Sequence, residues 1–216
     1  IGTTTCDNTR HDKWTRAPRV DMEVPLNKST LTVSSPFGGL LYVVVPDKVE
    51  SSQRQIKVTL RNACRAAWFK TGRDTLEAWK KNIRDQPAPW AEIESDKIIL
   101  TVPSNLVRTL DDPVALLEYW DKIADQDAAL TAIPSVRRSA ERLCADVQLC
   151  AGWMHAGYPI MIPDVTAKEL VNLSTLKSKG DWGFFHEIGH NHQNSDWTFS
   201  GTGEVTVNFF TLYNME

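Results

Sequence analysis

The stretch Asp181-Trp182-Gly183-Phe184-Phe185-His186-Glu187-Ile188-Gly189-His190 predicts a helix that carries a metal-binding pair. Positions i and i+4 lie one turn apart on the same face of a helix, so the imidazoles of His186 and His190 can converge on one ion. Imidazole nitrogens suit zinc, and a catalytic zinc usually has three protein ligands and one open position. Glu187 stands where the acid of this pattern acts as general base. We therefore expect zinc on His186 and His190, with Glu187 as the catalytic residue.

This short pattern needs a third ligand before it indicates a site. Glu204 lies fourteen positions after His190, in a Gly-rich turn that opens an apolar segment and can bring a carboxylate back over the metal. Asp196 is the rival, because metzincins place their last ligand at that position. Their pattern also needs Gly where this chain has Gln193, at a strained turn out of the helix. We favour Glu204 and keep Asp196 as the alternative.

Two neighbouring polar residues have open roles. Asn208 lies one helical turn after Glu204 and could hydrogen-bond a ligand imidazole from behind, although an exposed or capping Asn is an equal alternative. His192 comes two residues after His190 and therefore points away from the metal face. We expect it to make a hydrogen bond or to face substrate.

Three motifs occur in a fixed order along the chain. His186–Gln193 is followed by a Trp and then by Gly203–Asn208, while Ser35–Tyr42 and Ala151–Met161 lie upstream. Together they resemble the signature of the enhancin-like, mucin-degrading zinc metallopeptidases, peptidase family M sixty, which includes related animal channel-associated factors. The similarity runs from about residue 21 to the end of the chain.

This resemblance implies a zinc-dependent endopeptidase of proteins, often O-glycosylated mucin-like glycoproteins, that uses a metal-activated water and Glu187 as general base. It also implies aromatic side chains near the zinc that contact sugar. Trp182 and Trp197 are the candidates, with ordinary packing as the alternative. The channel-associated relatives suggest a second function, a partner-binding domain that keeps the metal motif without proteolysis.

A glycine-flanked stretch from Trp153 to Met161 follows an alternating strand and could be the edge strand that pairs with an extended substrate. Pro159 suits an edge position because it lacks a ladder donor. Trp153, His155 and Tyr158 are therefore candidate substrate-binding residues, with a core strand and turn as the alternative. His155 and Tyr158 are also candidates for stabilising an oxyanion.

Charge and hydropathy limit the classes of partner. The chain has 216 residues, 42% of them hydrophobic, a net charge of −3 and a pI near 6.0. These values show no excess of positive charge that would indicate binding to nucleic acid or to an anionic membrane. No apolar run approaches the roughly 20 residues that span a bilayer. We expect a protein or glycoprotein substrate, no nucleic acid and no transmembrane segment.

Four cysteines, Cys6, Cys64, Cys144 and Cys150, are too few and too scattered to predict a disulfide scaffold or a cysteine metal site, and we expect core or free thiols. Glycosylation sequons begin at Asn27 and Asn172 and would matter in a secreted protein. A secreted or cell-surface location is favoured over the cytoplasm.

The expected fold class is α+β. A connecting segment or linker over 1–20 is expected to precede a peptidase domain over 21–216. Within this domain we expect a strand-rich part over about 21–110 and a helical, gluzincin-type zincin part over about 111–216. The second part is expected to be truncated at its C-terminus. The strands are expected over 29–33, 40–45, 55–60, 97–102 and 143–149, the first two as a hairpin whose second strand is buried. Helices are expected between Asp74 and Pro87 and over 111–126, 166–176 and 182–191.

Overall fold

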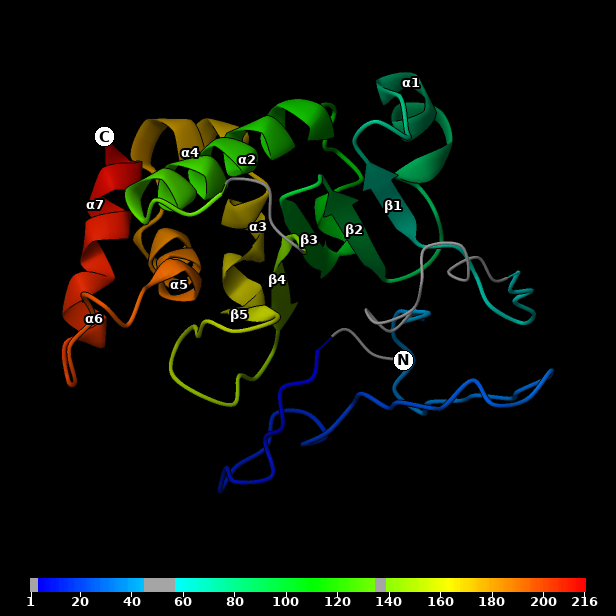
Figure 1. Ribbon diagram of the computed structural model, residues 1–216. Helices are drawn as coiled ribbons and strands as arrows, with labels where there is room; N and C mark the ends of the chain where they lie inside the picture. The colour runs from blue at the N-terminus through cyan, green and yellow to red at the C-terminus, as the bar shows by residue number, and fades with distance from the viewer. Residues whose placement is uncertain (1–3, 45–56, 135–138) are drawn as a thin grey trace.

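The computed structural model describes residues 4–44, 57–134 and 139–216 and shows a mixed α/β fold around one five-stranded sheet (Figure 1). The strands lie in chain order: β1 (Ala67–Lys70), β2 (Trp90–Glu94), β3 (Ile98–Pro103), β4 (Glu141–Asp146) and β5 (Ile160–Pro163). Only the β2–β3 pair is antiparallel among these neighbours.

The two faces of the sheet have different partners because side chains alternate along each strand. Leu143 and Ala145 of β4 belong to the main hydrophobic core, which includes residues of the helices. Cys144, between them, points to the other face and joins a smaller cluster with Met161 of β5 and Cys6 of the N-terminal coil, residues 4–44. Helices therefore cover one face, and N-terminal chain covers part of the other.

The helical elements of the described residues are mostly short. They are α1 (Leu76–Ala78), a π-helical turn (Trp79–Ile83), 3₁₀ turns (Ser104–Leu106 and Asp164–Thr166), α2 (Pro113–Leu130), α3 (Ala167–Leu170), α4 (Leu173–Lys179), α5 (Trp182–His192), α6 (Gly203–Thr206) and α7 (Asn208–Met215). The helix expected after Asp74 is thus a short α-turn continued by a π-turn.

The longest helix, α2, forms where local signals predict it. The Asp112 carboxylate accepts a hydrogen bond from Ala115 N at 2.9 Å, and Pro113 occupies the first turn. Trp120 is fully buried, and its Nε1 donates to Leu170 O at 3.1 Å. Figure 1 shows α2 alongside α5 and α7, so this helix supports the segment that carries the metal motif.

The N-terminal part is not mainly β in the described residues. Residues 29–44 form no strand, and Val44 of the expected buried strand is 81% exposed. Residues 57–60 of the third expected strand are also coil; 45, 55 and 56 lie outside the described residues. A β-branched run becomes a strand only when another strand pairs with its backbone, and here the sheet begins at β1.

Expected strands later in the chain are confirmed with shifted ends. β3 matches the strand expected over 97–102, while β4 ends at Asp146, before the expected limit of 149. Only Ile160 and Met161 of the expected edge segment lie in β5, which is at the edge of the sheet. His155 makes an isolated bridge to Met161, and the rest of this segment is loop.

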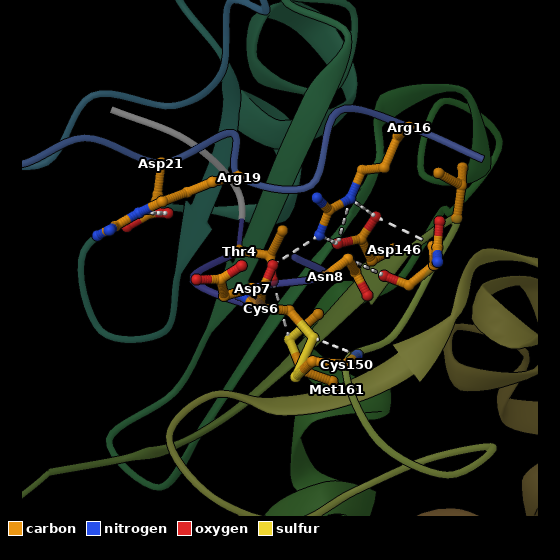
Figure 2. A network of polar contacts seen from close by, with 12 residues as sticks. Thr4, Cys6, Asp7, Asn8, Arg16, Arg19, Asp21, Asp146, Cys150 and Met161 are labelled. Carbon is orange, nitrogen blue, oxygen red and sulfur yellow. Dashed lines mark hydrogen bonds and ion pairs between the residues drawn. A yellow bond between two sulfur atoms is a disulfide. The ribbon is translucent and has the colours of Figure 1, made fainter. Parts of the chain in front are cut away.

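The N-terminal coil docks against β4 and the loop that follows it (Figure 2). Arg16 Nε and Nη2 donate to the Asp146 carboxylate at 2.8 and 2.6 Å, with both side chains largely buried. Cys6 and Cys150 form a disulfide across 144 positions of sequence. The expectation of core or free thiols is wrong for this pair, whereas Cys144 is a buried core thiol and Cys64 is an exposed free thiol, as expected.

No helix among the described residues is long and apolar enough to span a bilayer.

Candidate metal and peptidase site

The α5 helix has a clear N-terminal cap and a buried apolar face. The Asp181 carboxylate accepts a hydrogen bond from Phe184 N at 3.0 Å. Phe184, Phe185 and Ile188 are fully buried in the main core. This packing turns the other face, with His186 and His190, toward the segment that follows the helix.

Glu204 meets the two imidazoles from α6. Its Oε2 lies 3.1 Å from His186 Nε2 and 3.4 Å from His190 Nε2, and the two Nε2 atoms are 3.1 Å apart. The histidine side chains are 17% and 18% exposed, whereas that of Glu204 is 80% exposed, so the cluster opens to solvent on the carboxylate side. Two imidazoles and a carboxylate are a donor set that divalent metals use. Asp196 does not belong to this cluster of described residues.

Gln193 supports the cluster from behind, a role that sequence reasoning missed. Its Oε1 lies 2.7 Å from His190 Nδ1. Its Nε2 donates to Gly203 O and to Thr206 Oγ1, both at 2.7 Å. Because the amide oxygen can only accept, His190 Nδ1 carries the proton and Nε2 is left free to bind a cation. One side chain thus orients His190 and holds the helix of Glu204.

Asn208 hydrogen-bonds the backbone of Glu204 and not a ligand imidazole. Its side-chain nitrogen donates to the backbone oxygen of Glu204 at 3.0 Å.

The two other histidine contacts on α5 differ from each other. His186 Nδ1 is buried and has no hydrogen-bond partner among the described residues. His192 is buried, and its Nδ1 lies 2.8 Å from Ile188 O. His192 therefore belongs to the interior side of α5.

Glu187 is buried beside the two histidines. Burial raises the pKa of its carboxyl, and the charges of His186 and His190 act in the opposite direction. A raised pKa brings a carboxylate closer to the range in which it can accept and return a proton near neutral pH.

A close helix contact fixes the distance between α5 and α7. A Cβ added at Gly189 would lie 2.7 Å from Phe210 Cβ and 3.0 Å from Phe210 Cγ. Glycine is therefore required here by the approach of the two helices, and the same approach positions α6, which leads directly into α7.

Asn191 joins α5 to the loop between β4 and β5. Its Oδ1 accepts from Gly157 N at 3.0 Å, and its Nδ2 donates to Gly157 O at 3.0 Å and to Glu141 Oε2 at 2.7 Å. The upstream Ala151–Met161 motif is thereby held next to the helix of the histidines, another link that the sequence did not reveal.

The candidate substrate-contacting side chains differ in their surroundings. Trp153, Tyr158 and Trp182 are exposed, whereas Trp197 is partly buried with its ring centroid 5.8 Å from that of Phe210. His155 Nε2 faces the sulfur atoms of Cys6 and Cys150. Both ring nitrogens of His155 thus have neighbours within its own loop and the N-terminal coil.

Comparison with known proteins identifies the family of the chain. The family model described as "Peptidase M60, enhancin and enhancin-like" matches residues 62–216, and that of the N-terminal domain of M60-like peptidases matches residues 1–61. The chain belongs to the M60 peptidase family. The resemblance expected from the three motifs is therefore confirmed.

Proteins similar in sequence to this chain include some named for a different role. Human TRPM8 channel-associated factor 1 and mouse TRPM8 channel-associated factor 2 are each 42% identical over 214 residues. These matches cover 99% of this chain and 23% of each relative, so the chain spans about a quarter of the length of these proteins.

Solved structures share the fold. A conserved Bacillus anthracis protein of unknown function is 27% identical with a TM-score of 0.60, covering 68% of this chain and 33% of the other. A metallopeptidase from Bacteroides thetaiotaomicron is 18% identical with a TM-score of 0.58, covering 68% and 26%. Fold and family therefore agree on an M60-type peptidase domain.

Proposed function

We propose that this chain is the zinc-binding part of an endopeptidase, with His186, His190 and Glu204 as ligands. The convergence of these three ligand atoms supports the proposal most directly. Atoms bound tetrahedrally to zinc at about 2.0–2.2 Å lie roughly 3.3–3.6 Å apart. The observed separations of 3.1, 3.1 and 3.4 Å need little adjustment. A glutamate third ligand on a second helix is the gluzincin arrangement that we infer.

Catalysis in this proposal depends on Glu187. When bound, zinc lowers the pKa of a water molecule to about 7 and polarises the scissile carbonyl. The Glu187 carboxylate takes the proton of the attacking water and passes it to the departing amine. Gln193 keeps the proton of His190 on Nδ1 throughout.

The proposed substrates are proteins, in particular O-glycosylated mucin-like glycoproteins. The family of the chain and the exposed rings of Trp153, Tyr158 and Trp182 support this choice, because flat apolar faces can stack on sugar rings. A secreted or cell-surface location fits such substrates and fits the Cys6–Cys150 disulfide, which persists in oxidising compartments.

A partner-binding role is the second candidate. The channel-associated factors are more similar in sequence, at 42% identity, than the solved metallopeptidase from Bacteroides thetaiotaomicron, at 18%. In that function the metal site would stabilise the domain, and a protein partner would bind without being cleaved.

One experiment separates the two functions. The chain and its Glu204→Ala variant, both without added reductant, are assayed for bound zinc and for cleavage of a mucin-type glycoprotein before and after enzymatic removal of its O-glycans. If the chain is a peptidase, the native protein binds one zinc per chain and cleaves the glycoprotein, and Glu204→Ala loses the zinc and the cleavage. If the glycan is required, cleavage stops after the O-glycans are removed.

Bound zinc without cleavage of the glycosylated or the deglycosylated substrate supports partner binding. Asp196→Ala is the control and should keep its zinc.

A further inference from the structure

A second group of metal-ligating side chains lies outside the candidate active site. Cys6 comes from the N-terminal coil, while Cys150 and His155 come from the loop between β4 and β5. His155 Nε2 is 3.2 Å from Cys150 Sγ and 3.6 Å from Cys6 Sγ. One ligand atom from each residue lies within 4.8 Å of the other two.

The protonation of His155 prepares it as a ligand. Its Nδ1 lies 2.9 Å from Ala156 O, which can only accept a hydrogen bond. Nδ1 therefore carries the proton, and the lone pair of Nε2 is directed toward the two sulfur atoms. A backbone carbonyl that fixes the tautomer in this way is the usual support of a metal-binding histidine.

The backbone also favours a negatively charged sulfur at this place. Cys150 N lies 2.6 Å from Cys6 Sγ and can donate to it. A thiolate gains more from such a hydrogen bond than a thiol does, because the acceptor is then charged.

The position of Cys6 does not depend on the sulfur–sulfur bond alone. Arg16 Nη2 donates to Cys6 O at 2.9 Å while the same guanidinium binds Asp146, and Thr4 Oγ1 contacts Met161 Sδ at 3.2 Å (Figure 2). These contacts keep the Cys6 backbone beside the loop when the disulfide is reduced. The three donors then remain close together.

From this arrangement we propose that reduction converts the Cys6–Cys150 disulfide into a Cys₂His site for a single zinc ion. A dithiol reductant supplies two electrons and two protons to the disulfide and is itself oxidised to a disulfide. Zinc binding then releases the two thiol protons. Zn–S bonds of about 2.3 Å and a Zn–N bond of about 2.0 Å place nitrogen and sulfur roughly 3.5 Å apart in a tetrahedral site. The two observed nitrogen–sulfur distances are close to this value. Once the disulfide is reduced, rotation about the Cα–Cβ bonds of the two cysteines moves the sulfur atoms apart.

The site keeps the N-terminal coil fastened under both redox conditions. In an oxidising environment the link is the disulfide, and in a reducing environment it is the metal. The loop involved also binds Asn191 through Gly157, so its attachment reaches the helix of the active-site histidines. Disulfide and metal exclude each other because both use the same sulfur atoms.

Cobalt gives a test that reads only this site, because its thiolate charge-transfer band needs sulfur ligands and the His186–His190–Glu204 cluster has none. The chain is reduced with a phosphine, freed of metal, and titrated with Co²⁺. We expect the band to stop increasing when one Co²⁺ per chain has bound in addition to the Co²⁺ taken up by the active-site cluster. Added zinc should abolish the band. The oxidised chain should lack it.

Variants assign the ligands. We expect the Co²⁺ affinity, measured from the titration of the charge-transfer band, to fall at least tenfold in Cys6→Ser and in His155→Asn. The control variant Cys64→Ser should keep the native affinity. Circular dichroism shows whether each variant is folded. A reduced native chain without a stoichiometric band would overturn the proposal. A band in the oxidised chain would also overturn it. The same holds if a folded His155→Asn variant keeps the native Co²⁺ affinity, or if Cys64→Ser abolishes the band.

Discussion

Gln193 connects the two helices that supply the proposed zinc ligands. It accepts a hydrogen bond from His190 Nδ1 and donates to Gly203 O and Thr206 Oγ1 at the start of the Glu204 helix. The sequence offers a signal for this role only in retrospect, since Gln193 lies three positions after His190. Helical periodicity predicts the direction of His190, but it does not predict how a side chain just beyond the helix end will turn.

We predict that Gln193→Ala lowers zinc affinity by about 10–100-fold, the usual effect of losing a group that orients a metal ligand. Chelator competition measures it. Gln193→Glu keeps an acceptor for His190 but loses both donors to α6, so it separates the two roles. Equal affinity in native and Ala proteins would show that Gln193 does not position the site.

At the scale of elements, the helices with local signals are the ones that sequence predicts well. Asp112 with Pro113 marks the start of α2, and the histidine spacing marks α5. The expected N-terminal hairpin does not form in residues 29–44, because a strand needs a pairing partner and no strand of the described residues pairs with them. The close approach of Gly189 to Phe210 is likewise a property of two packed helices, and the pentapeptide alone does not contain it.

Gly189→Ala should separate α5 from α7 and displace Glu204. Its Cβ would meet the Cβ of Phe210, which cannot rotate away, so we expect an overpacking cost of about 1–3 kcal/mol in the free energy of unfolding. Urea unfolding of the metal-free chain measures the cost, and chelator competition measures the accompanying loss of zinc affinity. Gly203→Ala is the control, because a Cβ there meets nothing within 4 Å. Native-like stability and affinity in Gly189→Ala would contradict the proposed helix contact.

The cap of α5 gives a separate prediction. Asp181→Ala removes the acceptor for Phe184 N and should cost about 1 kcal/mol of unfolding free energy. Asp181→Asn keeps an acceptor oxygen and should lose much less. If urea unfolding gives the same loss for both variants, charge rather than capping is the important property of Asp181.

At the scale of the whole molecule, two long-range links attach the N-terminal coil to β4 and the loop that follows it. The Arg16–Asp146 pair and the Cys6–Cys150 disulfide join residues more than 125 positions apart in sequence. No local pattern in the sequence predicts such pairings. The family motifs predict which residues matter near the metal, whereas the attachment of the coil becomes visible only in three dimensions.

Arg16→Ala should destabilise the fold by roughly 3 kcal/mol, because it leaves the largely buried Asp146 carboxylate without its cation. Arg19→Ala is the matched control. Its side chain is 65% exposed and its pair with Asp21 should contribute less than about 1 kcal/mol. Chemical unfolding measures both changes, and limited proteolysis follows release of the coil. Equal stability of the two variants would exclude Arg16 as the anchor.

The most direct test of the proposed peptidase compares the native chain with Glu187→Gln in zinc content and in cleavage of a mucin-type glycoprotein. The substitution preserves the shape of the side chain and removes its ability to accept a proton. We predict one zinc per chain in both oxidised proteins and cleavage by the native chain alone. Equal cleavage by the two proteins would contradict the assignment of Glu187 as the general base.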